Sequence, residues 1–123
     1  MPRNSLNPAQ PKTGSSTARL ERLIGVKFKN HALLEEALTH KSYAMERGGA
    51  MPFNERLEFL GDSVLSSAVA HHLFNRYPDV DEGRLSQLKS MLVSRPSLTA
   101  WGRDIEIGQF LRLSDGENAT GGR

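Results

Sequence analysis

The fold of this chain is decided by the stretch Asn54-Glu55-Arg56-Leu57-Glu58-Phe59-Leu60-Gly61-Asp62-Ser63-Val64-Leu65. Three of these residues are carboxylates, at positions 55, 58 and 62, spaced three and then four residues apart. On a helix this spacing places them on one face, in a sector about 60° wide at roughly 100° per residue. Stacked carboxylates with no base between them repel each other, and a hard cation such as Mg²⁺ or Mn²⁺ relieves the repulsion through oxygen ligands. The stretch therefore predicts a helix with one acidic, cation-binding face.

Apolar residues continue the same helical pattern. A stripe roughly 130° from the acids consists of Leu57, Leu60, Val64 and Ala68. The side that carries the acids also becomes apolar further along, from Leu65 to Leu73. This pattern predicts that the acids lie at the rim of a core-facing side. Gly61 lies inside the helix, where it costs about 1 kcal/mol relative to Ala, and this predicts a large group packed closely over it.

Length and composition limit the class of protein. With 123 residues, 37% of them apolar, the chain is one domain at most. It has no secretory signal and no apolar run of the roughly 18 residues that a transmembrane helix needs. The absence of cysteine excludes disulfides and thiolate metal sites. We therefore expect a cytoplasmic protein.

The charge is unevenly distributed. Residues 1–29 carry six Lys or Arg and one acid, whereas residues 30–123 carry ten Lys or Arg and thirteen acids. Residues 1–17 are rich in proline and polar residues and are expected to form a disordered basic leader. Residues 18–123 are expected to form the folded domain, whose slight acidity gives no sign of nucleic-acid binding from composition alone.

The apolar periodicity predicts helices throughout the folded part and no strands. A short helix is expected from Ala18 to Ile24, and a second from Asn30 to about Lys41. The long acidic helix should run from Asn54 to Arg76 and end before Pro78. Asp81 should cap the next helix, and Pro96 suits the first turn of another that ends near Asp104, with Leu98 and Trp101 inside. Residues 115–118 are expected to form turns. The fold class is all-α.

The ten residues Asn54–Ser63 read N-E-R-L-E-F-L-G-D-S, which resembles the signature of the ribonuclease III family. The resemblance covers about residues 19–123 and extends through Leu38–Ser42, Pro78–Gly83, Leu111–Leu113 and Gly121–Arg123. It implies the helical fold of a ribonuclease III endonuclease domain. In that family the domain continues into closing helices with the motif Asp-x-x-Glu-Ala, and a double-stranded-RNA-binding domain follows. The chain is therefore expected to be the N-terminal part of the catalytic domain, with Leu57, Leu60 and Val64 poorly covered.

The resemblance assigns roles to five residues. Glu58 and Asp62 match metal ligands and are the expected catalytic residues. Glu55 matches an acid that organises the RNA cleft and the subunit contact, although a first-turn acid that complements the helix dipole is an equal alternative. Phe59 matches an anchor in the dimer interface, with a place in the core as the alternative. Glu82 resembles an acid of the RNA cleft, or it is simply an acid at a helix start.

Three further groups of residues have structural interpretations. His40, Lys41 and Ser42 match a Thr-His-Lys-Ser box of the family and are expected to be structural. His71 and His72 point about 100° apart and are expected on the surface. The side chains that could contact phosphate, or simply face solvent, are Arg84, Lys89 and Arg95.

By resemblance, the complete protein is expected to be an Mg²⁺-dependent endoribonuclease, with Mn²⁺ as a substitute metal. It would cleave double-stranded RNA, such as ribosomal-RNA precursors and structured transcripts, to 5′-phosphate and 3′-hydroxyl ends. A homodimer is expected because the two strands of duplex RNA are related by near two-fold symmetry. A second fragment with the Asp-x-x-Glu helix would complete the site, so the chain alone is expected to be inactive. The alternative is a catalytically silent dimerisation or RNA-binding module.

Overall fold

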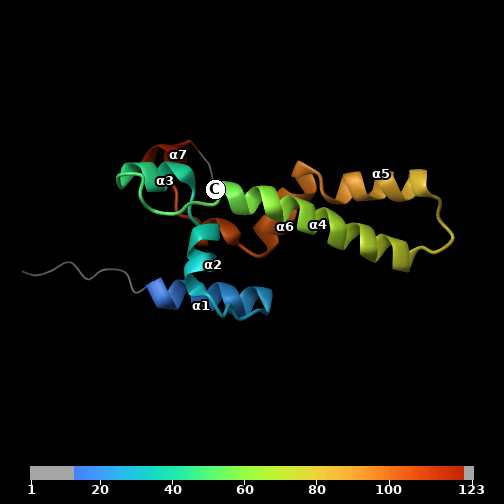
Figure 1. Cartoon of the computed structure of the whole chain (residues 1–123), viewed down its shortest axis with the longest axis horizontal. Helices are drawn as coiled ribbons and strands as arrows, with labels where there is room; N and C mark the ends of the chain where they lie inside the picture. Colours follow the sequence, from blue (N-terminus) through green and yellow to red (C-terminus); the bar gives the residue numbers. More distant parts are fainter. Residues whose placement is uncertain (1–12, 121–123) are drawn as a thin grey trace, which may run out of the picture.

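The structure, a computed structural model, describes residues 13–120, and these residues are helical with no β-strand. One end of the molecule holds α1, α2, α3 and α7, while α4 and α5 run side by side as a hairpin that extends away from it (Figure 1). Helix α6 and the 3₁₀ helix η1 lie between these two parts (Figure 1). The elements are α1 (Thr13–Ile24), α2 (His31–Ala37), α3 (Lys41–Glu46), α4 (Glu55–Arg76), α5 (Glu82–Leu92), α6 (Arg95–Asp104), η1 (Ile107–Phe110) and α7 (Asp115–Ala119). The predicted all-α class is confirmed.

The hydrophobic core is small and lies where α1, α2 and η1 meet. Its buried members are Leu20, Leu34, Leu38 and Phe110, and half-buried apolar residues pack around them. Helix α1 begins at Thr13, five residues earlier than expected, and residues 1–12 of the predicted leader lie outside the described part of the chain. Thr17 is only 6% exposed, so burial of this residue favours an extra helical turn in a segment of low helix propensity.

The single helix predicted from Asn30 to Lys41 is wrong, because the chain forms two helices there. Helix α2 begins with Asn30 as its cap and ends at Ala37, and α3 begins at Lys41. Between them Thr39 forms an isolated parallel bridge with Arg112, and its hydroxyl donates 2.6 Å to the carbonyl of Glu35. Pairing with a segment more than 70 residues away, which local periodicity does not reveal, interrupts the helix.

The α4–α5 hairpin agrees with the sequence prediction. Helix α4 spans Glu55–Arg76, and α5 begins after Asp81, whose carboxylate accepts a hydrogen bond of 2.8 Å from the Arg84 amide. Pro96 lies in the first turn of α6, which ends at Asp104. Two details differ: Trp101 is 40% exposed rather than inside, and residues 115–119 form the short helix α7 rather than turns.

The outer faces of the hairpin are largely uncovered. Leu73 is the only buried residue of α4, whereas Leu60 and Val64 are 58% and 60% exposed and Leu57 is half-buried. This confirms the expectation that the apolar stripe is poorly covered. The prediction of a large group over Gly61 is wrong for the described residues, because no atom lies within 4 Å of the position that a Cβ would take. No described helix combines the length and hydropathy needed to cross a bilayer.

Candidate metal-binding face of helix α4

The N-terminus of α4 is anchored to the segment between α2 and α3. The Asn54 amide donates 2.9 Å to the carbonyl of Thr39, and its side-chain Nδ2 donates 3.2 Å to the carbonyl of Ala37. The Asn54 side chain forms no cap on α4; it ties the helix start to α2 instead. Because the Glu58 amide in turn donates 2.8 Å to the Asn54 carbonyl, the first turn that carries the acids has a fixed position.

The three acids lie in the first two turns of α4, and all three are exposed. Glu55 is paired with Lys41, whose Nζ lies 3.8 Å from Glu55 Oε1. Within residues 13–120, no Lys, Arg or His nitrogen lies within 4.0 Å of the carboxylates of Glu58 and Asp62. These two acids are therefore not neutralised by a close ion pair, whereas the first acid is.

The donor set at Glu58 and Asp62 fits part of a site for a hard divalent cation. Carboxylate oxygens one helical turn apart are the ligands that Mg²⁺ accepts, usually with several waters retained. The described residues contain no group of three or more His, Cys, Asp or Glu side chains placed to hold a metal ion. Glu58 and Asp62 thus supply two ligands, and further ligands have to come from other residues or from substrate.

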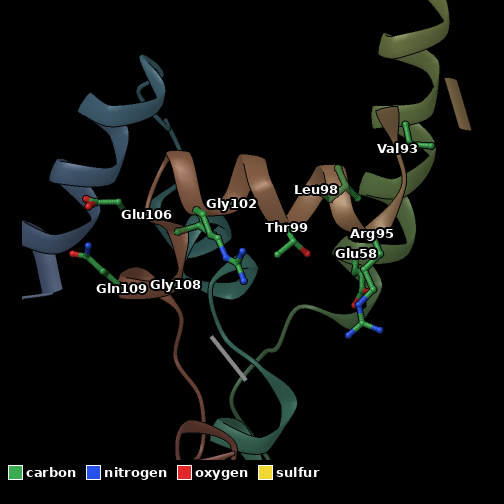
Figure 2. A pocket seen from close by; sticks show the side chains of 11 residues that line it. Glu58, Val93, Arg95, Leu98, Thr99, Gly102, Glu106, Gly108 and Gln109 are labelled. Carbon is green, nitrogen blue, oxygen red and sulfur yellow. The ribbon is translucent and has the colours of Figure 1, made fainter. Parts of the chain in front are cut away.

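An open groove runs from Glu58 along α6 to η1 (Figure 2). Glu58 and Arg95 lie next to each other at the end where α4 meets α6, while Glu106 and Gln109 lie at the other end, toward α1 (Figure 2). Apolar groups of Val93, Leu98 and Ile107 also line the groove. It is therefore a surface with both apolar and charged parts, directly beside one of the candidate metal ligands.

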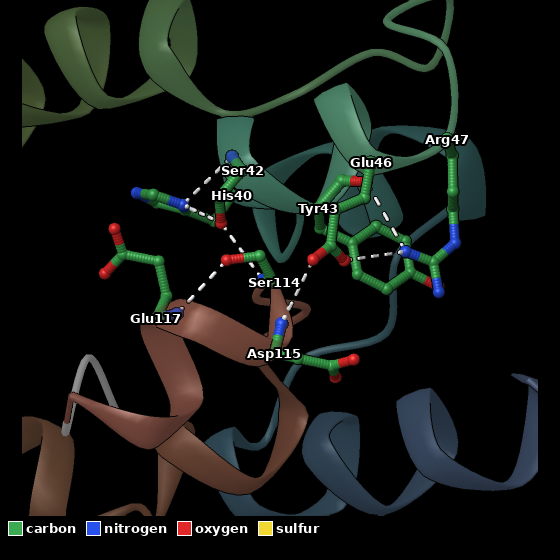
Figure 3. Close-up of polar contacts among 8 residues, drawn as sticks. All are labelled: His40, Ser42, Tyr43, Glu46, Arg47, Ser114, Asp115 and Glu117. Atoms are coloured by element: carbon green, nitrogen blue, oxygen red, sulfur yellow. Dashed lines mark hydrogen bonds and ion pairs between the residues drawn. The ribbon is translucent and has the colours of Figure 1, made fainter.

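The Thr-His-Lys-Ser box is a structural junction, as expected. His40 caps α3, because its Nδ1 accepts a hydrogen bond of 3.2 Å from the Ser42 amide (Figure 3). The Ser42 hydroxyl lies 2.7 Å from the same Nδ1 and accepts a hydrogen bond of 3.0 Å from the Ser114 amide. The box thereby joins α3 to the start of α7 and to the anchor of α4.

Glu82 is not close to the other acids. It begins α5, at the far end of the hairpin, and accepts a hydrogen bond of 2.8 Å from the Ser86 hydroxyl. The axial distance along α4 from Asp62 to Arg76 is on the order of 20 Å at 1.5 Å per residue. Within one chain Glu82 therefore acts as a helix-start acid, and a role in an RNA cleft remains a prediction.

Three other residues that the sequence analysis singled out lie on the surface. Phe59 is 81% exposed, so it is not part of the core formed by residues 13–120. His71 and His72 are both exposed, as expected. Sequence reasoning missed Lys41 as the partner of Glu55, because the two residues are fourteen positions apart on different helices and no local pattern indicates their contact.

An all-helical fold whose longest helix begins with three aligned acids is the arrangement of a ribonuclease III nuclease domain. A family model described as ribonuclease-III-like matches residues 30–123. The chain belongs to this family.

Individual relatives support the same family assignment. Ribonuclease 3 of Streptomyces coelicolor is 48% identical over 119 residues, which are 94% of this chain and 42% of that protein. Ribonuclease 3 of Bordetella petrii is 50% identical over 87% of this chain and 40% of its own length. The solved nuclease domain of ribonuclease III from Campylobacter jejuni superposes with a TM-score of 0.76 at 38% identity, covering 85% of this chain and 69% of that domain. The chain thus spans less than half the length of these curated relatives.

Proposed function

We propose that the protein is an endoribonuclease that hydrolyses double-stranded RNA with Mg²⁺, or Mn²⁺ in its place, and leaves 5′-phosphate and 3′-hydroxyl ends. The observation that carries this proposal is the pair Glu58 and Asp62 within the family signature on α4; both are exposed, and neither has an ion pair within 4.0 Å in the described residues. A bound Mg²⁺ supplies a nucleophilic water and stabilises the charge of the phosphodiester transition state. Ribosomal-RNA precursors and structured transcripts are the proposed substrates, in the cytoplasm.

In this proposal each part of α4 has a distinct task. Glu58 and Asp62 bind the metal ion, and their positions are held by the Asn54 anchor at the helix start. Two further acids, from an Asp-x-x-Glu helix outside residues 1–123, complete the ligand set. The protein that carries this chain, or a second fragment bound to it, is the proposed source of that helix.

We further propose that Phe59 anchors a homodimer, which would place two cleavage sites on the two strands of a duplex. A phenylalanine that is 81% exposed next to an exposed Leu60 is an apolar surface of the kind that marks protein contacts. The solved Campylobacter jejuni nuclease domain is described as having structural flexibility in a region involved in dimer formation.

The test is metal-dependent cleavage of a double-stranded RNA by the full-length protein, compared with its Glu58→Gln variant. We expect cleavage that requires Mg²⁺ or Mn²⁺ and is lost in the variant, while RNA binding persists. Binding of duplex RNA without cleavage by the unmodified protein, at any Mg²⁺ or Mn²⁺ concentration, would show the silent module instead.

A further inference from the structure

Within the described residues, Lys41 is the one cation that lies within 4.0 Å of an acid of the α4 face, whereas Arg95 lies beside Glu58 without such an ion pair. The Lys41 Nζ lies 3.8 Å from Glu55 Oε1 and 6.0 Å from the centre of the Phe53 ring. Glu55 therefore differs from Glu58, although the two acids are only three residues apart on the same helix face. Glu55 has an ion-pair partner in the protein, whereas Glu58 has none within 4.0 Å in the described residues.

The backbone of Lys41 has a fixed position relative to α4. Thr39, two residues before it, is 1% exposed, and its carbonyl accepts the hydrogen bond from the Asn54 amide. His40 is held on the other side by its amide, which donates 2.9 Å to the carbonyl of Arg112. Lys41 thus projects from an anchored segment that itself holds the start of α4, so the contact with Glu55 does not depend on side-chain conformation alone.

The spacing of the acids creates a choice of metal site. Glu55 with Glu58, three residues apart, and Glu58 with Asp62, four residues apart, are two overlapping pairs of neighbouring carboxylates on one helix face. A divalent cation could be drawn to either pair. A lysine beside Glu55 makes the first pair less negative and already uses one of its carboxylates, so the second pair is electrostatically favoured.

We propose that Lys41 is a positioning residue that keeps Glu55 out of the metal's ligand set and thereby directs the ion to Glu58 and Asp62. This inference rests on the proposed function, because it presumes that these two acids bind a divalent cation. Lys41 does not contact the metal or the RNA in this scheme. Its effect is exerted through Glu55, and both side chains are about half exposed, so high salt should weaken it.

The test measures Mn²⁺ binding to the full-length protein by electron paramagnetic resonance, in the absence of RNA. The Lys41→Met variant keeps a flexible stem over Phe53 but removes the charge, and Lys41→Arg keeps the charge. The matched control is Arg56→Met, because Arg56 is an exposed cation on the same helix and has no ion pair with the acids. All variants are first compared with the unmodified protein for thermal unfolding.

We expect Lys41→Met to bind Mn²⁺ at least threefold more tightly or with one additional ion per chain, and to show an altered Mn²⁺ spectrum. Arg56→Met and Lys41→Arg should match the unmodified protein. The double variant Lys41→Met with Glu55→Gln should restore the original affinity and spectrum, because the released carboxylate is then gone. Cleavage at saturating Mg²⁺ should fall in Lys41→Met and recover in Lys41→Arg.

Two outcomes would overturn the inference. Lys41→Met could bind Mn²⁺ as Arg56→Met does and differ only in thermal stability, or its additional binding could persist in the double variant. The proposed function fails separately: if Glu58→Gln and Asp62→Asn bind Mn²⁺ like the unmodified protein, the metal site itself is elsewhere. If Glu58→Gln and Asp62→Asn lose Mn²⁺ binding as the proposed function requires, but Lys41→Met binds Mn²⁺ like the unmodified protein, only the role of Lys41 is rejected.

Discussion

The three acids of α4 form one row in the sequence, but they have different surroundings in the structure. Glu55 is in an ion pair with Lys41, whereas Glu58 lies beside the groove along α6 and Asp62 is exposed one turn further on. The spacing of the carboxylates was sufficient to predict a shared helix face. It was not sufficient to identify Lys41, because the contact joins α3 and α4 across a connection of eight residues, 47–54.

At the same scale, Asp62→Asn should abolish RNA cleavage by the full-length protein. The amide keeps the shape of the side chain but removes the charge that binds a hard cation. We therefore expect kcat to fall by at least about 100-fold, which exceeds the usual effect of removing a residue that only hydrogen-bonds to a metal ligand. Steady-state cleavage of a labelled duplex measures the effect. Asp79→Asn, an exposed acid in the loop after α4, is the control and should have nearly full activity. Equal activity of both variants would contradict the role of Asp62.

At the scale of elements, the starts of α2, α5 and α6 were predicted well, whereas the start of α1 and the break before α3 were not. Asn30 and Asp81 cap α2 and α5 as expected, because caps act on amides two or three residues away, and Pro96 lies in the first turn of α6, where its fixed φ suits a helix. The break between α2 and α3 was missed, since it follows from the distant pairing of Thr39 with Arg112. The sequence thus predicted the features that depend on neighbouring residues, and it did not predict the break that depends on a distant contact.

The cap of α5 gives a prediction about stability. Asp81→Ala removes the carboxylate that accepts the hydrogen bond from the Arg84 amide, and loss of such a cap costs about 1 kcal/mol. The free energy of unfolding in urea should fall by this amount. Asp79→Ala, two residues earlier and without a capping contact, should leave it unchanged. A similar loss in both variants would mean that the loop charge, rather than the cap, is responsible.

At the scale of the whole molecule, the apolar surface of α4 is the main unexplained feature of one chain. Leu60, Val64 and Phe59 are all more than half exposed, although they belong to the longest helix. The buried core at α1, α2 and η1 is small by comparison. In the proposed nuclease, a second copy of the chain and the closing helices would cover the two sides of this surface.

Self-association can be tested at this scale. Phe59→Ala should weaken dimerisation of the full-length protein by about thirtyfold or more, because truncating a central aromatic anchor typically costs 2 kcal/mol or above. Sedimentation equilibrium measures the dissociation constant. Phe74→Ala, also on α4 and 69% exposed, is the matched control and should have little effect. Equal weakening by both changes would indicate non-specific association rather than an anchor.

The activity of the chain itself gives a further prediction. Purified residues 1–123 should not cleave duplex RNA, because Glu58 and Asp62 supply only two ligands and the described residues add no third acid to them. Addition of a segment with the Asp-x-x-Glu helix should restore metal-dependent cleavage. A gel assay of duplex RNA cleavage, with and without that segment, tests the prediction. Cleavage by residues 1–123 alone at the rate of the full-length protein would contradict it.

The sequence by itself determined the all-helical class, the bounds of α4, the start of α5, and the shared face of the three acids, because all of these depend on residues within one or two helical turns. The tertiary structure decided the break at Thr39, the pairing of Lys41 with Glu55, the separation of Glu82 from Asp62, and the exposure of Phe59. These features depend on which distant segments meet, and side-chain periodicity has no information about contacts between elements.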